Sequence, residues 1–146
     1  MSDSTPILVS ACLLGLRCRY DGSAKADARL LALAQTRALI PVCPEQLGGL
    51  PTPRPPAERV GARVLAAYGA DVSAAFARGA EETLRLAQLF GCKTAVLKAR
   101  SPSCGSGEIY DGTFSGRVTQ GQGVTAALLQ ANGITVLIEA DDLSVL

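Results

Sequence analysis

The chain has 146 residues, of which 48% are hydrophobic and 4% aromatic, and its 14 basic and 13 acidic side chains leave a net charge of +1. This length suits one domain, residues 1–146, and leaves no room for a second. The balanced charge and the absence of tryptophan argue against a nucleic-acid-binding surface. The absence of histidine excludes zinc fingers of the Cys/His type and leaves carboxylates, lysines, tyrosines or thiols to move protons.

Five cysteines are scattered along the chain, at positions 12, 18, 43, 92 and 104. An odd number without a secretory context argues against a disulfide framework, so we expect a cytoplasmic protein. A lipoprotein signal ending at Cys12 fits poorly, because the apolar run before it is too short. No apolar run reaches about 18 residues, so we expect no membrane-spanning segment.

The N-terminal half of the chain alternates short apolar runs with one helix. Residues 7–11 and 38–42 are apolar runs typical of strands buried on both faces, and each run ends at or just before a cysteine. Leucines among alanines predict a helix over residues 27–36. Prolines crowd residues 44–56 and predict an ordered loop there.

The C-terminal half repeats the alternation. Its apolar spacing and turn residues predict, in order, a short strand with a turn, a long amphipathic helix, a third buried strand, a hairpin, a last helix and a last strand. These elements cover residues 63–68, 72–90, 94–97, 109–118, 124–130 and 134–138. Alternating strands and helices predict an α/β fold with a Rossmann-like, doubly wound, mostly parallel sheet and a small hairpin.

Three cysteines follow strands of this predicted sheet. In such sheets ligands bind outside the carboxyl ends of the strands, and Cys12, Cys43 and Cys104 each come after a strand at that edge. We therefore expect their thiols to meet. Cys92 precedes its strand, so we expect it at the opposite edge as a small buried hydrophobic residue.

Four interpretations of the three cysteines remain open from spacing alone: chance, a zinc site, a thiol redox group and an iron–sulfur site. Structural zinc sites and thiol redox pairs usually show Cys-x-x-Cys, which this chain lacks. Iron–sulfur clusters are held by thiolates, and a cluster held by three leaves one iron open as a Lewis acid. Cys18 could be a fourth ligand or a second thiol, although a structural role is favoured.

Four longer motifs follow one another over nearly the whole chain. They are Ser10-Ala11-Cys12-Leu13-Leu14-Gly15, Cys18-Arg19-Tyr20-Asp21-Gly22, Pro41-Val42-Cys43-Pro44-Glu45-Gln46-Leu47-Gly48-Gly49-Leu50-Pro51-Thr52-Pro53-Arg54 and Lys98-Ala99-Arg100-Ser101-Pro102-Ser103-Cys104-Gly105. In this order they resemble the thiouracil desulfidase (TudS) family, formerly a bacterial domain of unknown function.

The resemblance implies an oxygen-sensitive [4Fe-4S] cluster held by Cys12, Cys43 and Cys104, which removes sulfur from thiolated pyrimidines as sulfide without net redox change. Glu45 and Ser101 match the positions to which the family assigns catalytic work. A chain without histidine needs a carboxylate to move protons, and Glu45 stands two residues after a predicted ligand. The Ser101 hydroxyl can stabilise charge that develops on the ring.

Other readings of these side chains are structural. Glu45 could brace its loop and Ser101 could stabilise a turn. Ser103 and Gly105 are candidates to hydrogen-bond the substrate or the cluster, whereas Arg54 could equally be a surface charge.

Two functions of different classes follow. The first is a desulfidase acting on a small thiolated nucleobase or nucleoside, such as 2-thiouracil, 4-thiouracil or 4-thiouridine. The second is a non-catalytic iron–sulfur or zinc protein, a sensor or carrier, which needs neither a positioned carboxylate nor an open iron. A metal-free persulfide carrier is a third reading. Nothing in the sequence specifies an oligomeric state.

Overall fold

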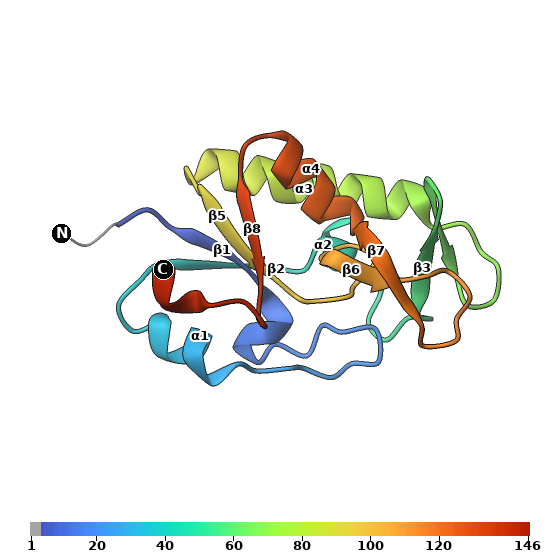
Figure 1. The fold of residues 1–146 in the computed structure, drawn as a ribbon, viewed down its shortest axis with the longest axis horizontal. Coiled ribbons are helices and arrows are strands. Elements are labelled where there is room, and N and C mark those ends of the chain that lie inside the picture. Colours follow the sequence, from blue (N-terminus) through green and yellow to red (C-terminus); the bar gives the residue numbers. More distant parts are fainter. Residues whose placement is uncertain (1–3) are drawn as a thin grey trace.

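The computed structural model describes residues 4–146 and is built around a four-stranded sheet (Figure 1). Its strands lie in the order β2 (Leu39–Val42), β1 (Ile7–Ser10), β5 (Thr94–Leu97) and β8 (Thr135–Ile138). Every neighbouring pair is parallel. The predicted α/β fold with a mostly parallel sheet is therefore confirmed.

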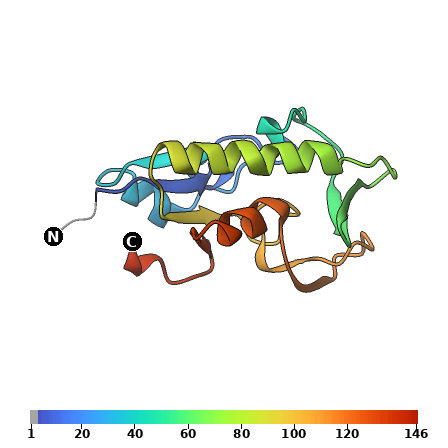
Figure 2. The ribbon, with the colours of Figure 1, turned by 90° about the horizontal axis from the view of Figure 1, so that it is seen from above.

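Helices cover both faces of this sheet. In chain order the helical segments are η1 (Ala11–Leu14), α1 (Ala28–Leu33), α2 (Pro44–Leu47), α3 (Ser73–Leu89), α4 (Val124–Ala131) and η2 (Leu143–Val145). The long helices α3 and α4 lie together on one face, and α1 and η2 lie on the other (Figures 1 and 2). Within residues 4–146 no helix has the length and apolar character needed to cross a membrane.

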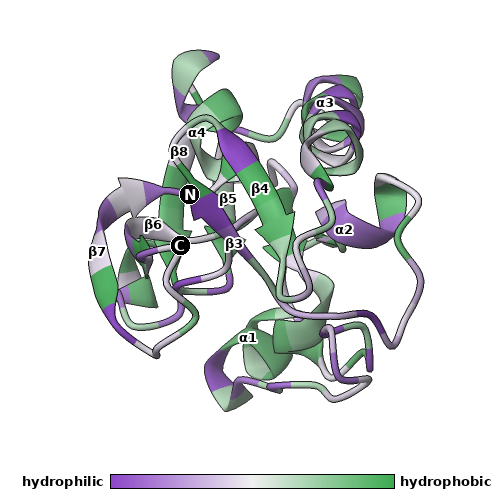
Figure 3. Ribbon diagram, turned by 90° about the vertical axis from the view of Figure 1, so that its right-hand side faces the viewer, coloured by the Kyte–Doolittle hydropathy of each residue, from purple (hydrophilic) through white to green (hydrophobic). Residues whose placement is uncertain are grey.

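The sheet separates two hydrophobic clusters. Leu8 of β1 packs with residues of α3 and α4, whereas its neighbours Ile7 and Val9 pack with Leu30 of α1 and Leu143 of η2. Successive side chains of a strand point to opposite faces, so β1 is buried on both. Figure 3 shows that α4 is largely hydrophobic, whereas α3 carries hydrophilic and hydrophobic residues along its turns.

Two antiparallel hairpins extend the fold beyond the sheet. The first pairs β3 (Ala57–Val60) with β4 (Arg63–Ala66), and the second pairs β6 (Ser106–Tyr110) with β7 (Val118–Gln122). The predicted hairpin at 109–118 is thus longer than expected. Strand β3 was missed because it follows directly on the proline-rich segment.

Helix α2 was also missed, and the expectation that residues 44–56 form only loop is wrong at their start. Pro44 occupies the first turn of α2, where its missing N–H has no partner to lose. Two glycines bring α2 against α3: a Cβ on Gly48 would lie 2.0 Å from the Ala75 carbonyl oxygen, and one on Gly79 would lie 1.9 Å from that of Pro44. Only glycine permits this approach, which fixes where α2 sits.

Candidate functional site

The carboxyl ends of β1, β2 and β5 open onto one cavity of about 570 Å³. Strand β1 lies between β2 and β5, so the cavity stands where the strand order reverses, the usual place for a ligand in an open α/β sheet. Loop 18–25, the segment 54–58 and the β6–β7 hairpin supply the other walls.

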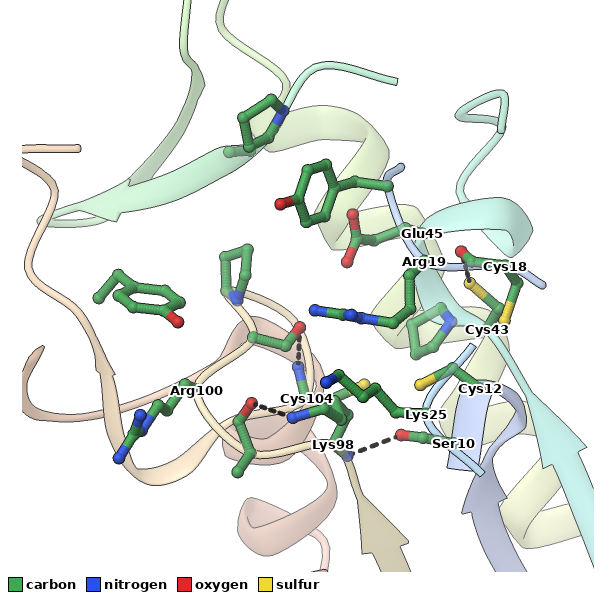
Figure 4. A pocket seen from close by; sticks show the side chains of 18 of the residues that line it. Ser10, Cys12, Cys18, Arg19, Lys25, Cys43, Glu45, Lys98, Arg100 and Cys104 are labelled. Atoms are coloured by element: carbon green, nitrogen blue, oxygen red, sulfur yellow. Dashed lines mark hydrogen bonds between the residues drawn. The ribbon is translucent and has the colours of Figure 1, made fainter. Parts of the chain in front are cut away.

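Cys12, Cys43 and Cys104 all line this cavity, as does Cys18, and Figure 4 shows the four side chains turned towards it. Cys12 lies in η1, Cys43 directly precedes α2, and Cys104 lies between β5 and β6. Cys12 is 7% exposed and Cys104 is 5% exposed, and both are free thiols. The structure thus brings together the three predicted ligands from distant parts of the chain.

Cys18 adds a fourth thiol to the same wall. Interaction with the Cys12 thiol is the main cause that raises the pKa of Cys18, and burial adds to it. The Cys43 thiol donates to the Cys18 carbonyl oxygen at 3.7 Å, and its contact with Cys18 together with burial raises the pKa of Cys43. Cys18 therefore packs between two predicted ligands rather than standing apart from them.

The remaining two cysteines differ in position. Burial raises the pKa of the Cys104 thiol to about 12, with hydrogen bonds from Ser10 and Ser103 acting in the opposite direction. Cys92 does not line the cavity and packs in the hydrophobic cluster under α3 and α4, just before β5. That is the opposite end of the strand from the cavity, where the sequence placed Cys92.

Glu45 reaches the cavity from α2 and forms an ion pair there. Its Oε1 accepts a hydrogen bond from Nε of Arg54 at 3.0 Å, with side chains 17% and 4% exposed. The reading of Arg54 as a surface charge is wrong, because its guanidinium is buried beside the cavity. The only sequence signal for this was its place at the end of a family-like motif.

Ser101 organises the turn that carries Cys104. Its hydroxyl oxygen accepts from the backbone N–H groups of Ser103 at 3.1 Å and Cys104 at 3.0 Å. A hydroxyl has two acceptor positions and one proton, so accepting twice leaves its O–H as a donor. Ser101 lines the cavity, so this donor is available to a ligand.

Ser103 and Gly105 lie behind the cavity wall rather than on it. The Ser103 side chain is fully buried, and its hydroxyl shares a hydrogen bond of 2.8 Å with that of Thr125. A Cβ on Gly105 would lie 2.7 Å from the Ser101 carbonyl oxygen and 2.9 Å from that of Glu108. These surroundings support roles in packing the turn, and substrate contact by either residue stays a prediction.

The β6–β7 hairpin closes one side of the cavity with aromatic side chains. Tyr110 and Phe114 line the cavity from this hairpin, and Tyr20 lines it from loop 18–25. The buried Glu58 carboxylate of β3 accepts from the N–H groups of Gly112 at 2.9 Å and Phe114 at 3.2 Å. Sequence reasoning missed Glu58, since its partners lie more than 50 residues away.

The thiols suit a cluster better than a single ion. In the described part of the chain, no three histidine, cysteine or acidic side chains converge closely enough to ligate one metal ion. An iron–sulfur cluster takes each thiolate on a different iron, so its ligands surround a volume rather than a point. Three free thiols from three separate segments around one cavity have the chemistry and the placement for that group.

Comparison with known proteins agrees with this arrangement. The family model of 2-thiouracil desulfurase matches residues 7–141. The YbbK protein of Bacillus subtilis (strain 168) is 45% identical over 143 residues, which cover 91% of this chain and 95% of that protein. A solved structure of a [4Fe-4S]-dependent thiouracil desulfidase, TudS, is 52% identical with a TM-score of 0.87, covering 92% of this chain and 90% of that one. The chain therefore belongs to the 2-thiouracil desulfurase family.

Proposed function

We propose that this protein removes sulfur from a thiolated pyrimidine of the thiouracil type, using a [4Fe-4S] cluster, and releases sulfide. The observation that carries the proposal is the meeting of three free thiols, two of them buried, with one carboxylate and one hydroxyl donor around a single cavity. The family model and the TudS-like structure support the same activity. A sensor or carrier would have no use for the positioned Glu45.

Cys12, Cys43 and Cys104 would hold the cluster by their thiolates. Once bound, the cluster supplies a Lewis acid for the thiocarbonyl sulfur, because three protein ligands leave one iron without a protein donor. The protein supplies the surroundings: Cys104 and Cys12 are buried at the cavity, and Tyr20, Tyr110 and Phe114 line its other walls.

Glu45 and Ser101 would perform the proton chemistry. Water must lose protons as it adds to the carbon that carries sulfur, and Glu45 is the carboxylate on the thiol side of the cavity. The Ser101 O–H, whose oxygen is fixed by two backbone N–H groups, would donate to the charge that builds up on the pyrimidine.

The cavity walls suit a small planar ring. Tyr20, Tyr110 and Phe114 offer aromatic surfaces against which a pyrimidine can stack. A cavity of about 570 Å³ has room for a thiolated nucleobase or nucleoside. We also propose a single domain over residues 1–146 and a cytoplasmic location, since five free thiols suit a reducing compartment.

Anaerobic reconstitution with iron and sulfide, followed by a sulfide-release assay on 2-thiouracil, 4-thiouracil and 4-thiouridine, tests this function. We expect cluster absorbance and sulfide release from the wild type, and no cluster in Cys43→Ala. Glu45→Gln should keep its cluster and lose at least about a hundredfold in kcat, since general acid–base catalysis contributes roughly 10²–10⁴-fold. Glu82→Gln, an exposed carboxamide substitution on α3, is the matched control.

Two other results of this assay would lead to different conclusions. A bound cluster without sulfide release would favour the sensor or carrier reading. A wild type that binds no cluster would contradict the proposal altogether.

A further inference from the structure

Arg54 is a buried cation beside the cavity, with a side chain only 4% exposed. A guanidinium removed from water costs free energy unless hydrogen bonds replace its hydration, so its partners indicate what it does. Its backbone N–H also donates to the Tyr20 carbonyl oxygen at 2.8 Å, which ties residue 54 to loop 18–25.

Three neutral oxygens hold the plane of this guanidinium. Nη1 donates to Thr52 Oγ1 at 2.8 Å and to the Pro51 carbonyl oxygen at 3.2 Å, and Nη2 donates to the Cys18 carbonyl oxygen at 2.9 Å. A planar group held on both terminal nitrogens has little freedom to rotate. The direction of the remaining donor, Nε–H, is therefore set by the loops around it.

That remaining donor meets the Glu45 carboxylate. Nε donates to Oε1 of Glu45 at 3.0 Å, and among the described residues no side chain or backbone N–H donates to Oε2. One oxygen of Glu45 is thus held by Arg54 while the other is left for water or a ligand in the cavity. Resting on the proposed function, we propose that Arg54 is the positioning residue that fixes the orientation of the Glu45 carboxylate for the reaction.

The same guanidinium also sets Glu45 relative to the thiols. The Cys18 carbonyl oxygen that accepts from Arg54 also accepts from the Cys43 thiol at 3.7 Å. Arg54 therefore contacts both the carboxylate and the loop that packs against the predicted ligands. Lysine carries the charge but not the fork of donors, so it cannot make all of these bonds from one position.

Steady-state kinetics of the reconstituted protein test the proposal. We expect Arg54→Lys to lower kcat by about ten- to hundredfold while KM changes less, because misplacing a catalytic group by about 1 Å can cost roughly a hundredfold. Guanidinium ions should restore part of kcat to Arg54→Ala. Arg78→Ala, an exposed substitution on α3, should leave kcat unchanged.

A double-mutant cycle separates positioning from simple bracing of the loop. If Arg54 acts through Glu45, Arg54→Lys should lower kcat no further in a Glu45→Gln background. Thr52→Val removes one of the bonds that hold the guanidinium, together with the bond that Gln46 Nε2 donates to Thr52 Oγ1 at 2.8 Å. It should lower kcat a few-fold and lose this effect in Glu45→Gln, whereas Gln46→Ala, which removes only the second bond, should change kcat less. Thr52→Val, the milder variant, decides the question if substitutions of Arg54 prevent folding.

A spectroscopic measurement is independent of turnover. The Nε–H resonance of Arg54 should exchange slowly with solvent in the wild type and shift in Glu45→Gln. If the wild type releases no sulfide but this coupling is seen, the proposed function fails and the Arg54–Glu45 positioning stands. Two results would overturn the proposal. One is that the effects of Arg54→Lys and Glu45→Gln on kcat are fully additive, and the other is that Glu45→Gln leaves the Nε–H resonance of Arg54 unchanged.

Discussion

Ser101 and Ser103 stand two residues apart in one turn but meet different surroundings. The Ser101 hydroxyl lines the cavity and keeps its proton available, because its oxygen already accepts two backbone N–H groups. The Ser103 hydroxyl is fully buried against Thr125. Equal substitutions at the two positions should therefore affect different properties of the protein.

We predict that Ser101→Ala lowers kcat at least tenfold with the cluster still bound, and also lowers the free energy of unfolding by about 1 kcal/mol, because two N–H groups lose their acceptor. Ser103→Ala should lower stability by about 1 kcal/mol or more, since the buried Thr125 hydroxyl and the Cys104 thiol each lose a partner, and should lower kcat less than Ser101→Ala does. Sulfide-release kinetics and urea unfolding of the reconstituted variants measure both effects. A Ser103→Ala variant with unchanged stability and a raised KM would instead support substrate contact by Ser103.

At the residue scale, the positions of the three thiols could be predicted from the sequence, whereas the roles of the charged side chains near them could not. Cys12, Cys43 and Cys104 could be placed at one edge because each follows a strand, a feature that periodicity reveals. The roles of Arg54 and Glu58 depend on contacts that only the folded chain creates. No local pattern distinguishes such buried charges from solvated ones.

The contact between α2 and α3 is an element-scale feature on which the site depends. Helix α2 carries Glu45 and follows Cys43 directly, and its position relies on backbone contact through Gly48 and Gly79. In an ordinary helix, replacing glycine by alanine raises stability by up to about 1 kcal/mol. Here the new methyl group would overlap the Pro44 carbonyl oxygen, which lies 1.9 Å from the Cβ position of residue 79.

We therefore predict that Gly79→Ala lowers the free energy of unfolding by about 1–3 kcal/mol, against the helix trend, because the overlap forces α2 away from α3. Iron content per chain after reconstitution should fall as well, since Cys43 moves with α2. Ala77→Gly, on the exposed side of α3, is the control: it should cost about 1 kcal/mol and leave iron content unchanged. Full iron content in Gly79→Ala would show that α2 can move without disturbing the site.

Elements with strong periodicity were predicted and short irregular ones were not. The 17-residue helix α3 and the four apolar strands are recognisable from their spacing alone. Helix α2 has four residues and begins at a proline, and β3 has four residues with an alternation too short to identify. Helix α2 packs closely against α3, and β3 pairs with β4, and sequence spacing reveals neither contact.

On the scale of the whole molecule, the parallel sheet brings thiols from three distant segments of the chain to one cavity. The neutral thiol is favoured there in the cluster-free protein: burial raises the pKa of Cys104 to about 12, whereas an unfolded cysteine titrates near 8.5. A raised pKa in the folded state contributes stability below the unfolded pKa. That contribution is lost as pH rises from about 8.5 towards the folded value.

We predict that the cluster-free protein loses about 1 kcal/mol of unfolding free energy through Cys104 between pH 7.5 and pH 9.5. Anaerobic urea unfolding at the two values measures the loss, and Cys104→Ala should show a correspondingly smaller one. The reconstituted protein should not share this loss, because iron binds the thiolate and the folded state then no longer holds those protons. An equal loss in Cys104→Ala and in the wild type would mean that the Cys104 thiol is not buried as a neutral group, and an equal loss with and without iron would mean that Cys104 is not a ligand.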